Sequence, residues 1–135
     1  SQLNPSHGAK LKRARHVISE NIRTKKAVEV IKSQNIFELG ELMTESHQSL
    51  QYDYEVSSPA LDEIVHTALK SEHCYGARMT GGGFAGCAIA LVNREMVSQF
   101  CAEILENYQS PALQPAESPT KVFPVRASAG ASLIQ

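Results

Sequence analysis

Residues 76–87 read GARMTGGGFAGC, and the elements before and after this glycine-rich stretch are organised around it. Four of the eight glycines fall between positions 81 and 86, and three of them are consecutive. Consecutive glycines are used where the backbone needs a positive φ or must approach another group closely. A β-prone piece precedes them and an apolar run, residues 87–92, follows them. The pattern predicts two strands, at about 77–80 and 87–92, joined by a glycine loop.

The glycine loop has two chemical interpretations. A dinucleotide fingerprint or a Walker loop places a helix directly after its glycines, whereas here a short apolar run follows that is typical of a buried strand. A phosphate would therefore be bound through backbone N–H groups in a nest-like turn. The alternative is a glycine-rich hairpin without a ligand, because a single glycine cluster is a weak motif.

The composition is that of an ordinary globular domain: 135 residues, 42% apolar and 20% charged. With 13 Lys and Arg against 14 Asp and Glu, the net charge is near zero, which argues against a dedicated nucleic-acid-binding protein. No apolar run approaches the ~20 residues of a membrane span, and no signal segment opens the chain. We therefore expect a cytoplasmic protein with neither nucleic acid nor membrane as a partner.

The three cysteines are Cys74, Cys87 and Cys101, an odd number without metal-ligand spacing. They predict reduced thiols and no metal site. We expect Cys87 and Cys101 to be packed inside the protein.

Apolar periodicity predicts four helices, at about residues 10–33, 36–50, 58–71 and 94–108, after a lead-in loop at residues 1–9. Ser58 and Asn93 are the expected N-caps of the last two helices, and Pro59 suits a first helical position. Gly40, in mid-helix, costs ~1 kcal/mol relative to alanine, so we expect it to allow the close approach of a neighbouring element.

Each helix carries an apolar stripe that we expect to face the core. The four stripes consist of Leu11, Ala14, Ile18, Ile22, Val28 and Ile31; of Ile36, Leu39, Met43, His47 and Leu50; of Leu61, Ile64, Val65, Ala68 and Leu69; and of Val97, Phe100, Cys101, Ile104, Leu105 and Tyr108. The first helix is also basic. We interpret its lysines and arginines as a solvated face rather than an anion site, because no aromatic side chains are interleaved.

Residues 51–57 lack helical periodicity and predict a loop or a short extended piece. Residues 110–120, which hold three prolines, predict a loop, and residues 127–135 predict a small-residue tail. Residues 121–126 predict a last strand, which Pro124 restricts to an edge. The order of elements indicates a single α+β domain over residues 1–135, with helices packed on one face of a small antiparallel sheet.

A reaction centre is not evident in the sequence. There is no Gly-x-Ser-x-Gly elbow, no HExxH and no Walker loop, so we assign no catalytic residue. Asp53 and Glu55 are interpreted as solvated charges. His47 is interpreted as a hydrogen-bonded core histidine, since a catalytic base would need a partner that the sequence does not identify.

The stretch at residues 76–87 resembles the third conserved motif of the GHMP small-molecule kinases, in the form carried by galactokinases. The similarity continues, in the family's order, in residues 14–21 (ARHVISEN), 40–50 (GELMTESHQSL) and 54–62 (YEVSSPALD), so it covers most of residues 12–93. Residues 121–130 are similar more loosely. Ala85 departs from the motif, where galactokinases usually have glycine, and alanine would strain the turn if that position required a positive φ.

The resemblance implies the ferredoxin-like C-terminal domain of such a kinase. The family's sugar-binding signature, phosphate loop and catalytic aspartate belong to an N-terminal kinase domain that is absent from this chain. The whole enzyme transfers the γ-phosphoryl group of Mg-ATP to the 1-hydroxyl of α-D-galactose, the first committed step of the Leloir pathway. The residues that match the family's loop near the ATP phosphates are Met79, Thr80, Gly81, Gly82, Gly83 and Phe84.

By the same resemblance, this chain's partners are its own N-terminal kinase domain and, in the intact enzyme, galactose, ATP and Mg²⁺. The chain alone is expected to bind no cofactor and to be inactive, and the face that meets the absent domain is expected to be apolar, which would allow self-association. Two alternatives stay open: another GHMP sugar kinase, acting for example on N-acetylgalactosamine or a uronic acid, and a free-standing ligand-binding or regulatory module.

Overall fold

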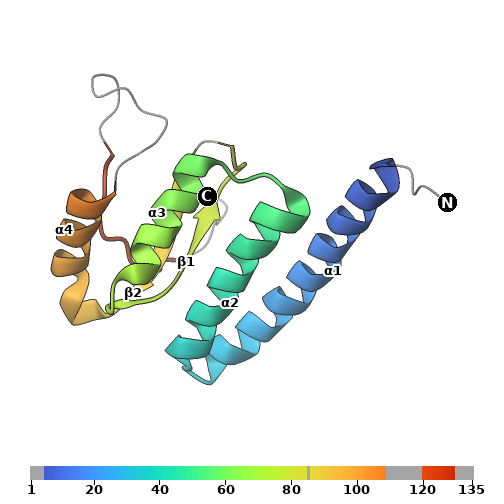
Figure 1. Ribbon diagram of the computed structural model, residues 1–135. Helices are drawn as coiled ribbons and strands as arrows, with labels where there is room; N and C mark the ends of the chain where they lie inside the picture. The colour runs from blue at the N-terminus through green and yellow to red at the C-terminus, as the bar shows by residue number, and fades with distance from the viewer. Residues whose placement is uncertain (1–4, 85, 109–119, 130–135) are drawn as a thin grey trace, which may run out of the picture.

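The computed structural model describes residues 5–84, 86–108 and 120–129. Within these ranges the fold consists of four α-helices, one hairpin and two short helical turns (Figure 1). In chain order the elements are α1 (Pro5–Lys32), α2 (Ile36–Ser49), the π-helical turn η1 (Leu50–Tyr54), α3 (Pro59–Lys70), β1 (Cys74–Thr80), β2 (Cys87–Val92), the 3₁₀ turn η2 (Arg94–Met96) and α4 (Val97–Asn107). Parts of the prediction fall outside the described residues. These are Ala85, residues 110–119 of the predicted loop and residues 130–135 of the predicted tail.

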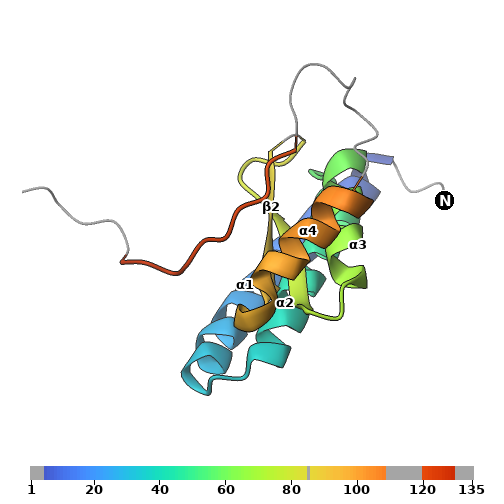
Figure 2. The same cartoon turned by 90° about the vertical axis from the view of Figure 1, so that its left-hand side faces the viewer.

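The hairpin confirms the predicted strand–loop–strand unit. β1 and β2 pair antiparallel, with Ala77 opposite Ala90, Met79 opposite Ala88 and Thr80 opposite Cys87. β1 starts earlier than the predicted residue 77, because a register shift between Cys74 and Gly76 allows three more residues to join the strand. The helices lie together on one side of the hairpin (Figure 2), as the element order predicts.

The core lies between the hairpin and α3. One buried cluster contains Val65 and Ala68 of α3, Ala77 of β1, and Phe100 and Ile104 of α4. A second cluster joins Leu50, Leu61 and Met79, with Val56 packed against it. The local signals for α3 are confirmed, since the Ser58 hydroxyl accepts a hydrogen bond from the Leu61 amide and Pro59 opens the helix.

α2 lies between α1 and β1, as Figure 1 shows, and it is buried on two faces. His47 and Leu50 of the predicted stripe are buried, but Ile36 is exposed and the stripe omits Leu42, Ser46 and Ser49, which are also buried. These additional residues are buried because α1 covers a second side of the helix.

The prediction for α1 is wrong in two respects. The helix begins at Pro5, so most of the expected lead-in loop at 1–9 is helical. Its apolar stripe does not face the core: the Leu11, Ile18 and Ile22 side chains are 62–66% exposed. The face that packs on α2 instead carries buried His16 and Val30, together with polar side chains that form the hydrogen bonds described below.

Three smaller expectations are also wrong. The loop predicted at 51–57 begins as the turn η1, which ends where Glu55 takes a left-handed conformation with φ of 58°. Residues 121–126 form no strand within the described segment 120–129, although Val122 packs against the first core cluster. Pro124 removes a ladder donor from that segment. Cys87 is exposed, because it lies where β2 leaves the loop. Cys101 is only half-buried.

Candidate functional site: the glycine loop and its supports

The glycine loop connects β1 to β2, and its backbone uses conformations that favour glycine. Gly81 and Gly83 have φ of 82° and 79°, and Gly86 has φ of 148°. Phe84 also has a positive φ of 56°, although it carries a side chain. This conformation places the Phe84 amide 2.7 Å from the Val56 carbonyl oxygen, to which it donates a hydrogen bond.

The three consecutive glycines are not equivalent. A Cβ atom at Gly83 would overlap the Val56 carbonyl oxygen and would lie 3.1 Å from Met79 Cε. A Cβ atom at Gly81 or Gly82 would meet nothing within 4 Å, and both residues are exposed. Gly83 therefore lets the loop pack closely on the protein, whereas Gly82 lies on the open side, where a further group could approach the backbone.

The six predicted site residues are contiguous, but they do not share one environment. Gly81, Gly82 and Phe84 are exposed, and the Phe84 side chain is 67% exposed. Thr80 is half-buried and Gly83 is buried. Met79 is 2% exposed and contributes its side chain to the core, so only its backbone can serve the loop.

Both backbone polar groups of Met79 are bound by side chains. The Met79 amide donates to Nδ1 of His47, 3.2 Å away. The Met79 carbonyl oxygen accepts a hydrogen bond of 2.9 Å from Nε of Arg78. Met79 is the second-last residue of β1, which ends at Thr80. The His47 and Arg78 side chains therefore hold the strand where it enters the loop.

His47 is buried and belongs to a partly buried polar cluster that joins α2, α3 and the segment between them. Its Nε2 lies 3.3 Å from Oδ1 of Asp62. Asp62 also accepts hydrogen bonds from Gln51 Nε2, at 2.8 Å, and from the Ser57 hydroxyl. Because Nδ1 accepts the Met79 amide proton, the neutral ring carries its proton on Nε2, facing Asp62.

Burial lowers the pKa of His47, and Arg78 lowers it further. The Asp62 carboxylate raises this pKa, but its effect is smaller than that of burial. The ring is thus held neutral. The interpretation of His47 as a hydrogen-bonded core residue agrees with this arrangement, and the partner that the sequence does not identify is Asp62. Since both ring nitrogens face groups of the protein itself, His47 is poorly placed to act as a base on a ligand.

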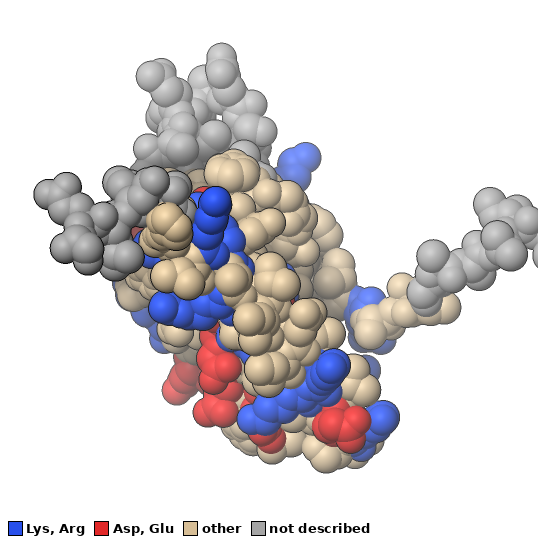
Figure 3. All heavy atoms as spheres, turned by 90° about the vertical axis from the view of Figure 1, so that its right-hand side faces the viewer, with Lys and Arg blue, Asp and Glu red and all other residues tan. Residues whose placement is uncertain are grey.

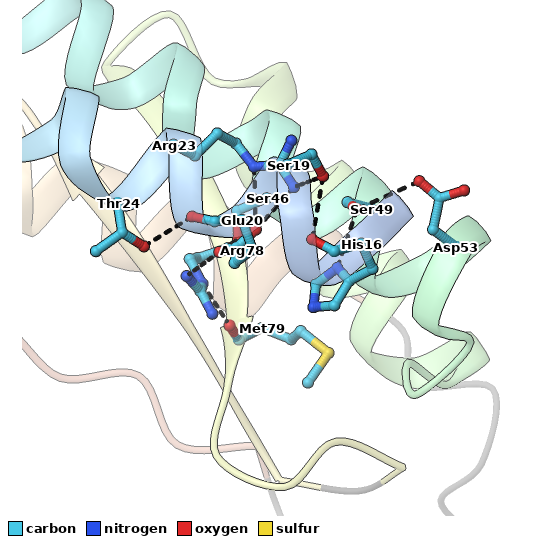
Figure 4. Close-up of polar contacts among 10 residues, drawn as sticks. All are labelled: His16, Ser19, Glu20, Arg23, Thr24, Ser46, Ser49, Asp53, Arg78 and Met79. Carbon is cyan, nitrogen blue, oxygen red and sulfur yellow. Dashed lines mark hydrogen bonds and ion pairs between the residues drawn. The ribbon is translucent and has the colours of Figure 1, made fainter. Parts of the chain in front are cut away.

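Arg78 belongs to a second cluster, between β1 and α1 (Figure 4). Its Nη1 lies 3.6 Å from Oε1 of Glu20, a residue on the inner face of α1. Glu20 also accepts hydrogen bonds from Ser46 of α2, at 2.6 Å, and from Arg23, at 2.8 and 3.0 Å. Burial alone would raise the pKa of Glu20, but the bonds from Ser46 and Arg23 and the nearby guanidinium charges lower it below its ordinary value.

The basic N-terminal half of α1 is not simply solvated. Lys12 and Arg13 pair with Glu55 at 3.1 and 2.8 Å, and Arg13 also donates to the Asp53 carbonyl oxygen. His16 bonds the Ser49 hydroxyl at 3.0 Å and stacks on Tyr54. These contacts fix η1 against α1, so Asp53 and Glu55, which the sequence suggests are solvated, have structural partners.

Shallow hollows lie on the described part of the chain, and two of them adjoin the polar clusters. One, of about 370 Å³, lies between α2 and α3 beside His47, Asp62 and His66. The other, of about 350 Å³, lies beside Arg15, Arg23 and Asp53. Neither is lined by residues 81–84. Gly81 and Gly82 are exposed, with nothing within 4 Å of a would-be Cβ, so the glycine loop presents an open surface that would need a second surface opposite it to enclose a ligand.

The described ranges contain neither a metal-binding cluster nor a membrane-spanning helix. Across residues 5–84, 86–108 and 120–129, no three His, Cys, Asp or Glu side chains are grouped so that they could hold a metal ion. In the same ranges, no helix has the length and apolarity that crossing a membrane requires.

This chain matches known proteins in both sequence and fold. The family described as GHMP kinases C terminal matches residues 27–110. The galactokinase of Streptococcus thermophilus is 48% identical over 100 residues, which are 74% of this chain and 26% of the relative. The galactokinase of Bacillus subtilis is 47% identical over 98 residues, which are 73% and 25%. The chain thus spans about a quarter of the length of these curated relatives.

The crystal structure of Lactococcus lactis galactokinase complexed with galactose superimposes with a TM-score of 0.71 at 47% identity, covering 74% of this chain and 26% of that one. The predicted α+β class, with helices on one face of a small antiparallel sheet, is therefore confirmed. On this fold and these matches, the chain belongs to the GHMP kinase family and carries its C-terminal domain.

Proposed function

We propose that this chain is the C-terminal domain of a cytoplasmic galactokinase, which phosphorylates the 1-hydroxyl of α-D-galactose with Mg-ATP. The observation that carries the proposal is the 47–48% identity to galactokinases over about three quarters of the chain. That identity extends well beyond a glycine loop, which alone would fit many hairpins.

In this proposal the chain contributes the glycine loop, and ATP supplies the transferred phosphoryl group. Phosphoryl transfer depends mainly on positioning and on stabilisation of charge. Exposed Gly81 and Gly82, with no neighbour within 4 Å of a would-be Cβ, leave room for the backbone to approach an anionic group closely. The loop fits a phosphate contact, and the backbone amides of Gly81 and Gly82 would add dipoles near it.

Catalytic groups and magnesium ligands are assigned to the rest of the enzyme. The two polar clusters around His47 and Glu20 use their carboxylates and imidazole on internal partners. The described ranges offer no group of three His, Cys, Asp or Glu side chains for a metal ion. We therefore propose that this chain is inactive alone and acts when joined to an N-terminal kinase domain.

The outer face of α1 supports such a partner. Leu11, Ile18 and Ile22 lie along one side of α1 and are 62–66% exposed. Figure 3 views the molecule from the α1 side and shows uncharged surface lying between groups of Lys and Arg. Exposed apolar stripes of this kind mark interfaces, so we assign this face to contact with the remainder of the enzyme.

Ligand-dependent thermal stability tests whether the binding of Mg-ATP and galactose requires the rest of the enzyme. Protein that binds a ligand only when folded melts at a higher temperature in its presence. The complete gene product should shift with Mg-ATP and with galactose, whereas the 135-residue chain should shift with neither. A shift of the chain alone with Mg-ATP would favour a free-standing binding module, and a shift of the complete product with N-acetylgalactosamine or a uronic acid but not galactose would favour another GHMP kinase.

A further inference from the structure

We propose that Asp62 is a positioning residue for the glycine loop, acting through His47 at the start of the loop and through Ser57 and Val56 at its far end. The role rests on the proposed function, because it assumes that the loop meets the nucleotide. The inference goes beyond the family match, since it assigns a task to side chains on α2 and α3 that lie outside the glycine motif.

The start of the loop needs support because β1 has no second strand beside Met79 in the described sheet. In an antiparallel pair, the N–H and C=O groups of one residue point to the same side. Met79 directs both groups away from β2, where the His47 ring and the Arg78 guanidinium bind them. A buried strand edge without such partners would cost free energy.

The far end of the loop is held by a different element. The Phe84 amide donates to the Val56 carbonyl oxygen at 2.7 Å, and Gly83 packs against the same oxygen. Val56 precedes Ser57, whose hydroxyl donates to Asp62 Oδ1. The same Asp62 oxygen lies 3.3 Å from His47 Nε2. One carboxylate on α3 therefore links the supports at the two ends of the loop.

The geometry makes the loop depend on helix side chains rather than on β2 alone. Gly81 and Gly83 adopt positive φ angles and have little intrinsic preference for one conformation. Fixing Met79 and Phe84 limits where the residues between them can lie. Because a displacement of about 1 Å at a phosphoryl-transfer site can cost about 100-fold in rate, such fixed ends would be needed for catalysis.

The test compares two carboxylates on the same helix in the complete gene product. Asp62→Asn keeps the size of the side chain but weakens its acceptance of hydrogen bonds from His47 and Ser57. Glu63→Gln is the matched control, because it removes the same charge one residue along α3 and Glu63 forms no hydrogen bond or ion pair with His47, Ser57 or Met79. Amide hydrogen exchange at Met79 and Phe84 and the steady-state constants for ATP and galactose are measured for both variants.

We expect Asp62→Asn to speed exchange at Met79 and Phe84 by about tenfold or more while Ala68 of α3 keeps its rate. We also expect kcat/KM for ATP to fall by about tenfold with the KM for galactose unchanged, and Glu63→Gln to match the wild type. Faster exchange spread evenly over the domain, or an equal effect of Glu63→Gln, would overturn the proposal. The exchange measurement needs no turnover, so a wild-type protein without galactokinase activity would refute the proposed function while leaving the positioning of the loop testable.

Discussion

Gly40 of α2 and Gly76 of β1 lie in direct backbone contact. A Cβ atom on Gly40 would overlap the carbonyl group of Tyr75, and a Cβ atom on Gly76 would overlap the carbonyl group of Gly40. The helix and the strand approach this closely only because both residues lack side chains. The contact confirms the prediction that Gly40 allows close approach, and it brings His47, two turns along α2, to the edge of β1 at Met79.

Replacing either glycine should therefore separate α2 from β1. We expect Gly40→Ala and Gly76→Ala each to lower the free energy of unfolding by about 2–3 kcal/mol, because the neighbouring backbone must move. Urea denaturation measures the change. Gly8→Ala is the control, since Gly8 lies exposed in α1 with open space around it, and should be neutral or stabilising by up to about 1 kcal/mol. Equal effects at positions 8 and 40 would contradict the account.

Substitution of Gly82 should affect activity, whereas substitution of Gly83 should affect stability. Gly82→Val should leave the free energy of unfolding within about 0.5 kcal/mol but lower the activity of the complete protein, because the new side chain occupies the open side of the loop. Gly83→Val should destabilise the fold, since its Cβ overlaps Val56 and its φ is 79°. Denaturation and turnover are measured for both. Equal losses of stability and activity at Gly82 would support a hairpin without a ligand.

Stability should fall when the pH drops below about 6.5, the ordinary pKa of histidine. The folded protein keeps His47 neutral with a lowered pKa, so below pH 6.5 the unfolded chain binds a proton that the folded chain does not, and the folded state loses stability. The charged groups facing His47 are Asp62 and Arg78.

Imidazole titration by NMR, alongside urea denaturation between pH 7.5 and 5, tests this pH dependence. His66→Gln, which removes an exposed imidazole from the helix that carries Asp62, is the control variant. A titration of His47 at or above 6.5 would show that the proposed origin of the pH dependence is wrong.

The outer face of α1 should make the isolated chain associate with itself. We expect the double variant Ile18→Gln and Ile22→Gln to be more nearly monomeric in sedimentation velocity with an unchanged free energy of unfolding, because both side chains are exposed. Lys10→Gln, which lies about 100° around the same helix from this apolar stripe, should not change the association. If the double variant unfolds more easily as an isolated chain, these side chains are part of the core after all.

Local signals explain why some of this fold is predictable. Ser58, Pro59 and the stripe through Val65 define α3 without any knowledge of its surroundings, and they are found as expected. The hairpin is equally local, since the glycines separate two short strands. The site residues 79–84 are contiguous for the same reason, although the burial of Met79 follows from packing against Leu50 and Leu61.

The supports of the loop could not be predicted because they join distant residues. His47 reaches Met79 across 32 positions, and Ser46 reaches Glu20 across 26. On α1, polar Glu20 and Arg23 look like solvent-facing residues, and Leu11 and Ile18 look like core residues, yet the structure places them the other way round. Apolar periodicity identifies a face that will be covered, but it does not say whether the rest of this chain or another surface covers it.

Galactose phosphorylation by the complete gene product, measured beside the 135-residue chain with Mg-ATP, tests the central claim most directly. The account predicts galactose-dependent consumption of ATP and formation of galactose 1-phosphate by the complete product and none by the chain alone. Turnover by the 135-residue chain, or a complete product that leaves galactose unmodified, would contradict it.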